Sequence, residues 1–392
     1  MSLIAAADIR CSRAHGKCTL SKRNDGMSIR ISLCMIVKNE EEVLARCLAS
    51  AAPIADEIII VDTGSTDRTK EIAREFTDQV YDFLWIDDFA AARNFSFSKA
   101  NMEYCMWLDA DDVIVPKQQE SFLSLKKTLT ASVDVVMLPY YAAVDQNGTP
   151  TFWYYRERIV RNAPRYRWEG PVHEAIVPSG NILYAKAAVT HCKMHRTQTD
   201  RNLKILQKAY DAKTLSPRLR FYYGRELYEH QRYAEAIKVL EEFWGDPGGW
   251  VENKIDACRT LADCYANQGL REMAYRTLLR SFILAPPRAE ICCEMGRLFM
   301  EDQAYESAIY WYQAALALPQ RPELGGFVMA DCYGYLPAIN LCVCYDRLGN
   351  REMAAFYNEE AGRYRPDSPA YLSNKAYFLN QCAQVKEERK NP

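Results

Sequence analysis

The sequence lacks the long apolar runs and the excess charge that would direct a chain to a membrane or to nucleic acid. No apolar segment approaches the roughly 20 residues that a membrane-spanning helix needs. Lysine and arginine (49) nearly balance aspartate and glutamate (51), so we expect no general attraction to nucleic acid. The apolar stretch at residues 3–7 is too short for the core of a secretory signal.

Two common phosphate-binding loops are also missing. Neither Gly-x-x-x-x-Gly-Lys nor Gly-x-Gly-x-x-Gly occurs anywhere in the chain. Because these loops cradle the phosphates in P-loop ATPases and in Rossmann dehydrogenases, the sequence disfavours both classes of enzyme.

Fourteen cysteines are present, but they are scattered along helical and strand patterns. The closely spaced ones, Cys292 with Cys293 and Cys342 with Cys344, have no cysteine or histidine partner at zinc-finger spacing. Buried thiols in a reducing compartment are therefore the expected explanation. Together with the missing apolar runs, this predicts a cytoplasmic protein.

The first part of the chain alternates strand and helix patterns. Apolar, β-branched runs predict strands at 29–37, 57–61 and 79–84 and a fourth ending near 108, with helices over 41–51, around Ile72 and Phe76, and from 87 to 101. Such alternation predicts an α/β domain with a mostly parallel sheet. A hairpin is expected next, with strands 133–144 and 151–160 joined by a turn at 145–148.

Three carboxylates, Asp109, Asp111 and Asp112, stand at the end of the fourth expected strand. Alternation along an extended backbone sends Asp109 and Asp111 to the same side, where they repel each other unless a cation lies between them. Oxygen ligands that leave most of the coordination sphere open suit Mg²⁺ or Mn²⁺ holding substrate phosphates. Taken alone, the same residues would also fit a solvated acidic turn.

Polar residues stand at the carboxyl ends of the other three expected strands as well. They are Asn39 and Glu40, then Asp62, then the segment that carries Asp88 and Arg93. Because ligands of parallel sheets bind beyond the carboxyl ends of the strands, the four clusters predict one shared site.

A nucleotide diphosphate held by a divalent cation fits this site. Asp62 could accept a hydrogen bond from a base N–H, and Asn39 or Glu40 could contact the base or ribose. Arg93 is expected to hold a phosphate or a base carbonyl, with Asp88 as its orienting partner.

Three of the five histidines, His173, His191 and His195, lie close together in the sequence. A structural role is the usual explanation for a histidine. His173 differs because it precedes Glu174 in a loop shaped by tryptophan, glycine and proline, so a role in the site is an equal alternative.

From about residue 201 the pattern changes to amphipathic helices that repeat. Four sets of residues share the same internal spacing, and they are Gly224, Leu227, Ala236, Leu240 and Phe243; Ala262, Tyr265, Ala274, Leu278 and Ser281; Gly296, Phe299, Ala308, Tyr312 and Ala315; and Cys342, Tyr345, Ala354, Asn358 and Ala361. The alanines are 38, 34 and 46 residues apart, which places insertions at 246–249 and 324–326. The pattern resembles the tetratricopeptide repeat, a helix-turn-helix unit of 34 residues.

Four blocks in the first domain resemble the signature blocks of glycosyltransferase family 2. They are Cys34-Met-Ile-Val-Lys-Asn-Glu-Glu41, Val61-Asp-Thr-Gly-Ser-Thr-Asp-Arg-Thr69, Asp88-Phe-Ala-Ala-Ala-Arg-Asn94 and Leu108-Asp-Ala-Asp-Asp112. The resemblance covers residues 29–195. With Gly170-Pro-Val-His-Glu174 and the helical repeats, the chain is similar to the bacteriocin S-glycosyltransferases of the sublancin type.

The resemblance implies a GT-A fold, a nucleotide-diphosphate sugar donor and transfer with inversion. By match to the family motifs, Val37, Asn39, Glu40, Asp62, Arg93 and Asp109 would bind the donor, and Asp109, Asp111 and His191 would hold Mg²⁺ or Mn²⁺. Inversion also needs a general base near the acceptor. Glu174 is the first candidate and His173 its competitor, with Asp112 third.

We therefore expect three parts: an extension at 1–28, for which disorder is one expectation, a GT-A glycosyltransferase domain at 29–200 and a repeat domain at 201–392. The acceptor is expected to be a peptide, protein or glycan, with a peptide or protein side chain slightly favoured because such repeats commonly receive peptides. Dimerisation is another use of the same repeats.

Two other functions are alternatives to sugar transfer. A repeat scaffold that binds nucleotide sugar without turnover would not need the acidic motif, Arg93 and Glu174 together. A sugar nucleotidyltransferase would need a glycine-rich basic loop after the first strand, which residues 38–40 do not provide.

Overall fold

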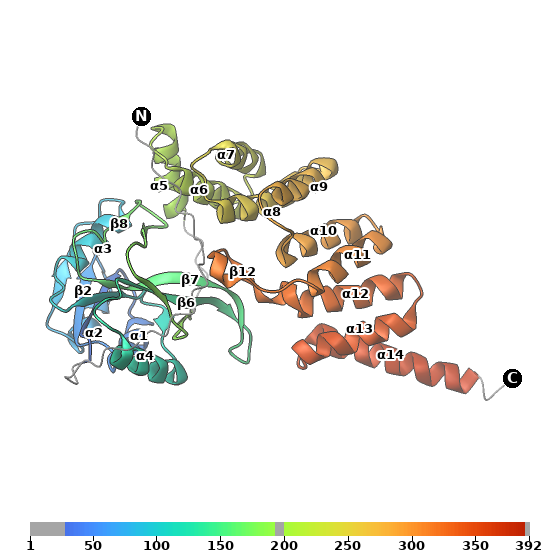
Figure 1. Ribbon diagram of the computed structural model, residues 1–392, viewed down its shortest axis with the longest axis horizontal. Coiled ribbons are helices and arrows are strands. Elements are labelled where there is room, and N and C mark those ends of the chain that lie inside the picture. Colours follow the sequence, from blue (N-terminus) through green and yellow to red (C-terminus); the bar gives the residue numbers. More distant parts are fainter. Residues whose placement is uncertain (1–27, 193–199, 389–392) are drawn as a thin grey trace, which may run out of the picture.

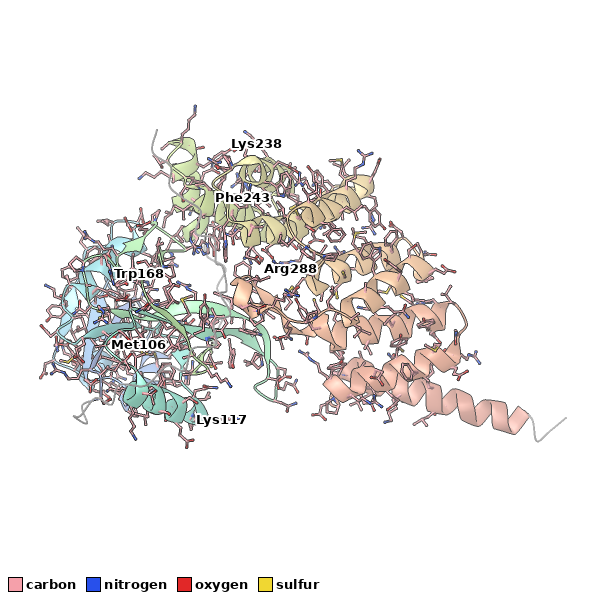
Figure 2. The ribbon with its side chains drawn as sticks, in the orientation of Figure 1. Met106, Lys117, Trp168, Lys238, Phe243 and Arg288 are labelled. Atoms are coloured by element: carbon pink, nitrogen blue, oxygen red, sulfur yellow. The ribbon has the colours of Figure 1, made fainter. Side chains whose placement is uncertain are left out.

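The computed structural model describes residues 28–192 and 200–388, which form a mixed α/β domain followed by a helical region (Figure 1). The predicted amino-terminal extension lies outside the described residues, apart from Ser28, and so does His195. Each part has its own core: Figure 2 shows Met106 within the α/β domain and Phe243 within the helical region, both almost fully buried.

The parallel part of the sheet has the strand order β3-β2-β1-β4. The strands are β1 (Ile31–Val37), β2 (Glu57–Asp62), β3 (Val80–Asp82) and β4 (Tyr104–Trp107). All three pairings between them are parallel, so their carboxyl ends meet at one edge. The four predicted strands are confirmed, each within a few residues of its expected limits.

Helices cover both faces of this sheet. They are α1 (Leu44–Ala51), α2 (Thr69–Arg74), α3 (Phe89–Phe97) and α4 (Pro116–Thr128). Leu33 and Met35 of β1 pack in the cluster that includes α1, α2 and α4, whereas Cys34 packs with α3 on the other face. Helix α4 was not predicted, because it buries only Phe122 and shows little apolar stripe.

The predicted hairpin is also confirmed, and it extends the sheet. Strand β6 (Val135–Val144) and strand β7 (Pro150–Arg161) are antiparallel, and β7 also pairs with β4. The short strands are β5 (Asp112–Val113), β8 (Trp168–Glu169), β9 (Ala175–Ile176), β10 (Ile182–Tyr184) and β11 (Val189–His191). Strand β11 pairs with both β6 and β5, which brings His191 opposite Asp112.

The helical region begins with α5 (Arg201–Asp211) and continues in antiparallel pairs. The pairs are α6 (Pro217–Glu229) with α7 (Tyr233–Gly245), α8 (Val251–Asn267) with α9 (Arg271–Arg280), α10 (Ala289–Glu301) with α11 (Tyr305–Leu316), and α12 (Tyr335–Arg347) with α13 (Arg351–Tyr364), and α14 (Pro369–Glu388) follows. Three 3₁₀ turns lie at Ser281–Ile283, Pro322–Leu324 and Ala330–Tyr333.

The residues that repeat in the sequence lie where the two helices of each pair pack together. Gly296 of α10 lies so close to α11 that a Cβ there would stand 2.8 Å from the ring of Tyr312. At the equivalent place in the next pair toward the amino terminus, Ala262 and Leu278 are both buried. The small residue of each first helix therefore lets the second helix approach, as in tetratricopeptide repeats.

One of the predicted insertions returns to the α/β domain. Between α11 and α12, strand β12 (Val328–Met329) adds to the edge of β7 in antiparallel pairing with Trp153 and Phe152. Figure 1 shows this segment reaching from the helical region to the sheet. The helical region is therefore joined to the sheet at a second place besides the chain connection.

None of the helices in the described ranges combines the length and the apolar character that crossing a bilayer requires. Up to residue 380, the eleven cysteines of the described ranges are free thiols, and all but Cys192 are buried.

Candidate functional site

A pocket of about 520 Å³ opens where the parallel strands end. Eight of the ten residues expected to bind the donor, to hold the metal or to be one of the two leading candidates for the base line it, and they are Val37, Glu40, Arg93, Asp109, Asp111, His173, Glu174 and His191. The convergence of strand-end clusters that the sequence suggested is therefore present.

The other two, Asn39 and Asp62, shape the loops beside this pocket. Asn39 has a left-handed backbone (φ 56°), and its Oδ1 accepts the Thr66 N–H at 2.8 Å. Oδ2 of Asp62 accepts the N–H groups of Gly64 and Ser65 at 3.0 and 2.9 Å. The buried Oδ1 of Asp62 has no hydrogen-bond partner among the described residues, so it is an acceptor that a ligand N–H would satisfy.

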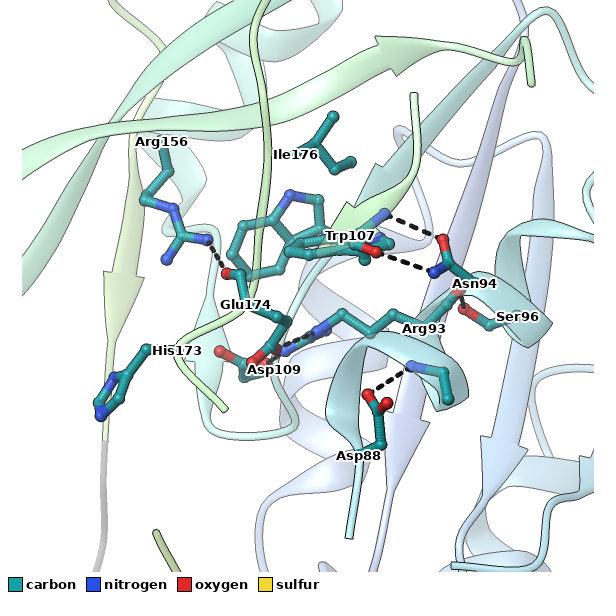
Figure 3. Close-up of polar contacts among 12 residues, drawn as sticks. Asp88, Arg93, Asn94, Ser96, Trp107, Asp109, Arg156, His173, Glu174 and Ile176 are labelled. Atoms are coloured by element: carbon teal, nitrogen blue, oxygen red, sulfur yellow. Dashed lines mark hydrogen bonds and ion pairs between the residues drawn. The ribbon is translucent and has the colours of Figure 1, made fainter. Parts of the chain in front are cut away.

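Arg93 is the centre of the polar network in the pocket (Figure 3). Its Nη2 lies 2.6 Å from Asp109 Oδ1, and its Nε lies 2.6 Å from Glu174 Oε1. The guanidinium is nearly buried and lies 4.9 and 4.8 Å from the ring centroids of Trp107 and Trp168. Such clamping fixes the two carboxylates relative to each other.

The acidic and basic groups of this network stabilise each other's charged forms. Desolvation alone would raise the pKa of Asp109, but the guanidinium of Arg93 and then that of Arg158 outweigh it and lower the pKa to about 2. Burial alone would lower the pKa of Arg93, but Asp109 and then Glu174 raise it above its ordinary value. Asp109 and Arg93 are therefore both charged at neutral pH.

Asp88 does not orient Arg93, contrary to the expectation from the sequence. Its Oδ1 accepts the Ala91 N–H at 2.9 Å and caps the first turn of α3. Asp109 and Glu174 do the orienting instead, because they reach the guanidinium from two other segments.

An acidic cluster that could hold a metal ion lies in the same pocket region. The ligand atoms of Asp111, Asp112 and His191 all fall within 4.8 Å of one another. His191 Nδ1 is 3.4 Å from Asp111 Oδ1 and 3.7 Å from Asp112 Oδ1. Neither His191 Nδ1 nor Asp112 Oδ1, both buried, has a hydrogen-bond partner in the described part of the chain. A cation between them would satisfy both atoms.

The two carboxylates also act on the charge of His191. The nearby carboxylate of Asp111 and then that of Asp112 favour the protonated imidazole and raise its pKa to about 9. A divalent cation would have to displace that proton, because only a neutral imidazole binds metal.

Asp112 enters the cluster through a buried ion pair that the sequence did not reveal. Its Oδ2 accepts from Arg158 Nη1 at 2.9 Å and from the Asp109 N–H at 3.0 Å. Arg158 is fully buried, with its guanidinium 3.7 Å from the ring centroid of Trp107 and 4.4 Å from that of Tyr140. This pair holds the acidic loop against the sheet.

Arg158 is buried because β7 is irregular at that point. Val136 pairs with Ile159 and Met137 pairs with Glu157, which leaves Arg158 as the extra residue of a β-bulge. The only signal in the sequence was three charged residues in succession, 156–158, within an otherwise apolar and aromatic strand.

The helical region supplies part of the pocket wall. His173 has a left-handed backbone (φ 50°), its Nε2 lies 3.1 Å from Glu226 Oε1, and its ring stacks on Tyr222 at 4.2 Å. Arg201 and Asn202 of α5 also line the pocket. These contributions leave no signal in the sequence, because no local pattern links residues in different domains.

The fold and the pocket define the class of the protein: a GT-A-like glycosyltransferase domain joined to a tetratricopeptide-like helical region. Residues 32–191 match the family described as Glycosyl transferase family 2. This part of the chain is therefore a glycosyltransferase family 2 domain.

Curated relatives share different portions of the chain. A TPR repeat-containing protein of Synechococcus elongatus is 30% identical over 298 residues, which is 74% of this chain and 66% of the relative. The SPbeta prophage-derived glycosyltransferase SunS of Bacillus subtilis is 26% identical over 225 residues, 54% of this chain and 52% of SunS. The lipopolysaccharide core biosynthesis glycosyltransferase LpsC of Rhizobium meliloti is 30% identical over 169 residues, 39% of this chain and 58% of LpsC. The chain thus spans between half and two thirds of their lengths.

Proposed function

We propose that the protein is a metal-dependent inverting glycosyltransferase that moves a sugar from a nucleotide-diphosphate sugar to an acceptor in the pocket. The observation that carries the proposal is the single network in which Arg93 holds both Asp109 and Glu174 beside the cluster of Asp111 and His191. A scaffold that only binds nucleotide sugar would have no use for this combination.

Mg²⁺ or Mn²⁺ would be held by Asp111 and His191, with Asp109 as the third ligand expected from the family and Asp112 beside them. The unpartnered, buried atoms of His191 and Asp112 in the described residues support this assignment. When bound, the cation supplies charge neutralisation for the leaving diphosphate.

The donor would bind through residues of the protein itself. Asp62 accepts a base N–H through its unpartnered Oδ1, and Val37, Asn39 and Glu40 form the wall beside the base and ribose. The Nη1 atom of Arg93 is buried and has no partner among the described groups, so it is available to a phosphate or sugar oxygen.

The group that takes the proton of the acceptor is proposed to be Glu174. Its ion pair with Arg93 holds one carboxylate oxygen, which positions the group at the pocket wall. His173 is the competitor, since Glu226 orients its imidazole in the same wall.

Two acceptor classes fit this reaction. The resemblance to sublancin-type transferases favours a peptide or protein side chain, whereas LpsC, which is named for lipopolysaccharide core biosynthesis, favours a glycan. We further propose a domain boundary at residue 200/201, a cytoplasmic location in keeping with the free thiols of the described residues, and the repeats as a site for acceptor binding or dimerisation.

A donor panel tests the transferase activity. Purified protein is incubated with Mn²⁺ or Mg²⁺ and a set of nucleotide sugars, and released nucleotide diphosphate is measured with and without EDTA. We expect release from one donor that EDTA abolishes. If no member of the panel gives release, and none binds by calorimetry, the proposal is refuted.

Two variants distinguish between the two candidates for the general base. Glu174→Gln should keep donor binding and lose transfer by about 10²–10⁴-fold, the usual contribution of a general base. His173→Gln should lower transfer much less. If the two results are reversed, His173 is the base and Glu174 serves only to orient Arg93.

A further inference from the structure

A second cavity adjoins the donor pocket at the junction between the two parts of the molecule. This junction pocket has a volume of about 210 Å³, and it shares Arg156 and His173 with the larger pocket. In Figure 3 both residues lie on the opposite side of Glu174 from Arg93. A molecule in the junction pocket would therefore approach the reaction centre from the side opposite the donor network.

Two regular surfaces face each other across the junction pocket. Strand β7 contributes the alternate residues Phe152, Tyr154 and Arg156, which share one side of the strand. Helix α6 contributes Arg218, Tyr222, Arg225, Glu226 and Glu229, whose spacing of three or four residues places them on one face of the helix. Both elements thus turn polar and aromatic side chains toward a common space.

Phe327 closes the third side of the junction pocket. Its ring lies 5.7 Å from that of Phe152 and 5.1 Å from that of Tyr154. The pairing of the next residue, Val328, with β7 holds it in place. The guanidinium of Arg225 lies 5.0 Å from the Phe327 ring, so residues from three separate segments meet here.

The chemistry of this lining suits a sugar ring. A pyranose has faces of C–H groups that pack on aromatic rings and an edge of hydroxyls that both donate and accept hydrogen bonds. Phe152 and Phe327 offer such aromatic rings, Arg225 is a fixed fork of donors, and Glu226 is an acceptor. The small volume fits one ring and its substituents better than an extended peptide.

We propose that the junction pocket binds one sugar residue of a glycan acceptor and presents its hydroxyl to the donor. This inference rests on the proposed transferase function and decides between its two acceptor classes. The acceptor oxygen forms the new bond to the anomeric carbon as the bond from that carbon to the diphosphate oxygen breaks. The hydroxyl proton passes to the Glu174 carboxylate, and the diphosphate leaves with the bonding electrons.

Two substitutions in the junction pocket test the proposal, neither of them in the catalytic network. Phe327→Ala removes an aromatic wall, and Arg225→Gln removes the charge from a half-buried helix position while keeping a polar side chain. Phe356→Ala and Arg276→Gln are matched controls, because they make the same changes at exposed positions elsewhere in the helical region.

The probes are the methyl glycosides of glucose, galactose, mannose, N-acetylglucosamine and glucuronic acid, and a pool of short peptides rich in serine, threonine and cysteine. Release of nucleotide diphosphate is measured with each probe, and glycoside binding is measured separately by saturation-transfer NMR without donor. We expect one glycoside to bind and to accelerate release. The pocket variants should raise its half-saturating concentration by about tenfold, the loss typical of a buried contact residue.

In the same variants, release without acceptor and the KM of the donor should stay within about twofold of wild type, because neither substitution changes a residue of the donor site. Acceleration by peptides but by none of the glycosides, or glycoside saturation that both pocket variants leave unchanged, would overturn the proposal. Absence of any glycoside signal by NMR would do the same. Failure of the proposed function is distinct, since it would appear as no donor binding and no release with any probe.

Discussion

At the scale of single residues, the site depends on one arginine that joins two acidic groups. Arg93 contacts Asp109 and Glu174 through different nitrogens while two indole rings hold its plane. Removing one partner from a buried ion pair leaves a charge without compensation, which typically costs about 3–5 kcal/mol. Arg93 therefore stabilises the fold in addition to the role toward the donor that we propose for it.

The substitution Arg93→Lys keeps the positive charge but removes the guanidinium group on which both roles depend. An ammonium group is a point charge that cannot present Nε and Nη2 to two carboxylates at once. We expect donor turnover to fall at least about 10²-fold, as when a preorganised electrostatic contact is lost, and the free energy of unfolding to fall by about 2–3 kcal/mol. Turnover assays and urea titrations measure the two quantities. Arg276→Lys, at an exposed helix position, is the control, and wild-type turnover in Arg93→Lys would contradict the account.

The raised pKa of Glu40 predicts that the stability of the protein depends on pH. Burial, followed by repulsion from Asp111 and Asp109, raises its pKa from 4.5 to about 7. Because the folded state holds the proton of Glu40 more tightly than the unfolded state does, the contribution of Glu40 to the free energy of unfolding should fall as the pH rises from 4.5 to 7 and level off above. Glu40→Gln removes this loss. In EDTA we expect the variant to gain about 1–2 kcal/mol over wild type between pH 4.5 and 8, less than the full shift because the group is only partly buried.

Urea unfolding at a series of pH values measures this difference, and Glu71→Gln, an exposed carboxylate, is the control. A constant difference between Glu40→Gln and wild type across the range would show that Glu40 has an ordinary pKa.

At the scale of elements, regular patterns were predictable and irregular ones were not. The apolar, β-branched run of β1 and the spacing of Gly296 and Tyr312 in the repeats are local patterns, so the sequence alone located them. Arg158 could not be found in this way, because a β-bulge turns it inward against the expected alternation. The same bulge sets the Asp112 carboxylate that completes the acidic cluster.

Gly296→Ala tests the repeat register. The added Cβ would stand 2.8 Å from Tyr312, so α10 and α11 must shift apart. We expect a loss of about 1–3 kcal/mol in the free energy of unfolding, the usual cost of overpacking, measured by urea titration. Gly245→Ala is the control, since a Cβ there meets nothing within 4 Å among the described atoms. Equal stability of the two variants would contradict the close approach.

At the scale of the whole molecule, the helical region takes part in building the site. Helix α6 holds His173 through Glu226 and Tyr222, and β12 extends the sheet beside β7. The sequence predicted each domain but not their meeting, because these contacts join residues far apart in the chain and leave no local periodicity. The expectation of a peptide acceptor came from the repeats and from the resemblance to sublancin-type transferases, whereas our proposal for the junction pocket favours a sugar.

The central claim is that the acidic cluster serves a metal-dependent transfer, and one comparison tests it most directly. Wild type, Asp111→Ala and the exposed control Asp82→Ala are assayed side by side for release of nucleotide diphosphate from the preferred donor in Mn²⁺. The account predicts EDTA-sensitive release by wild type and by Asp82→Ala, and at least about a 10²-fold loss in Asp111→Ala with the fold retained, as for loss of a directly stabilising group. Unchanged release by Asp111→Ala would contradict it.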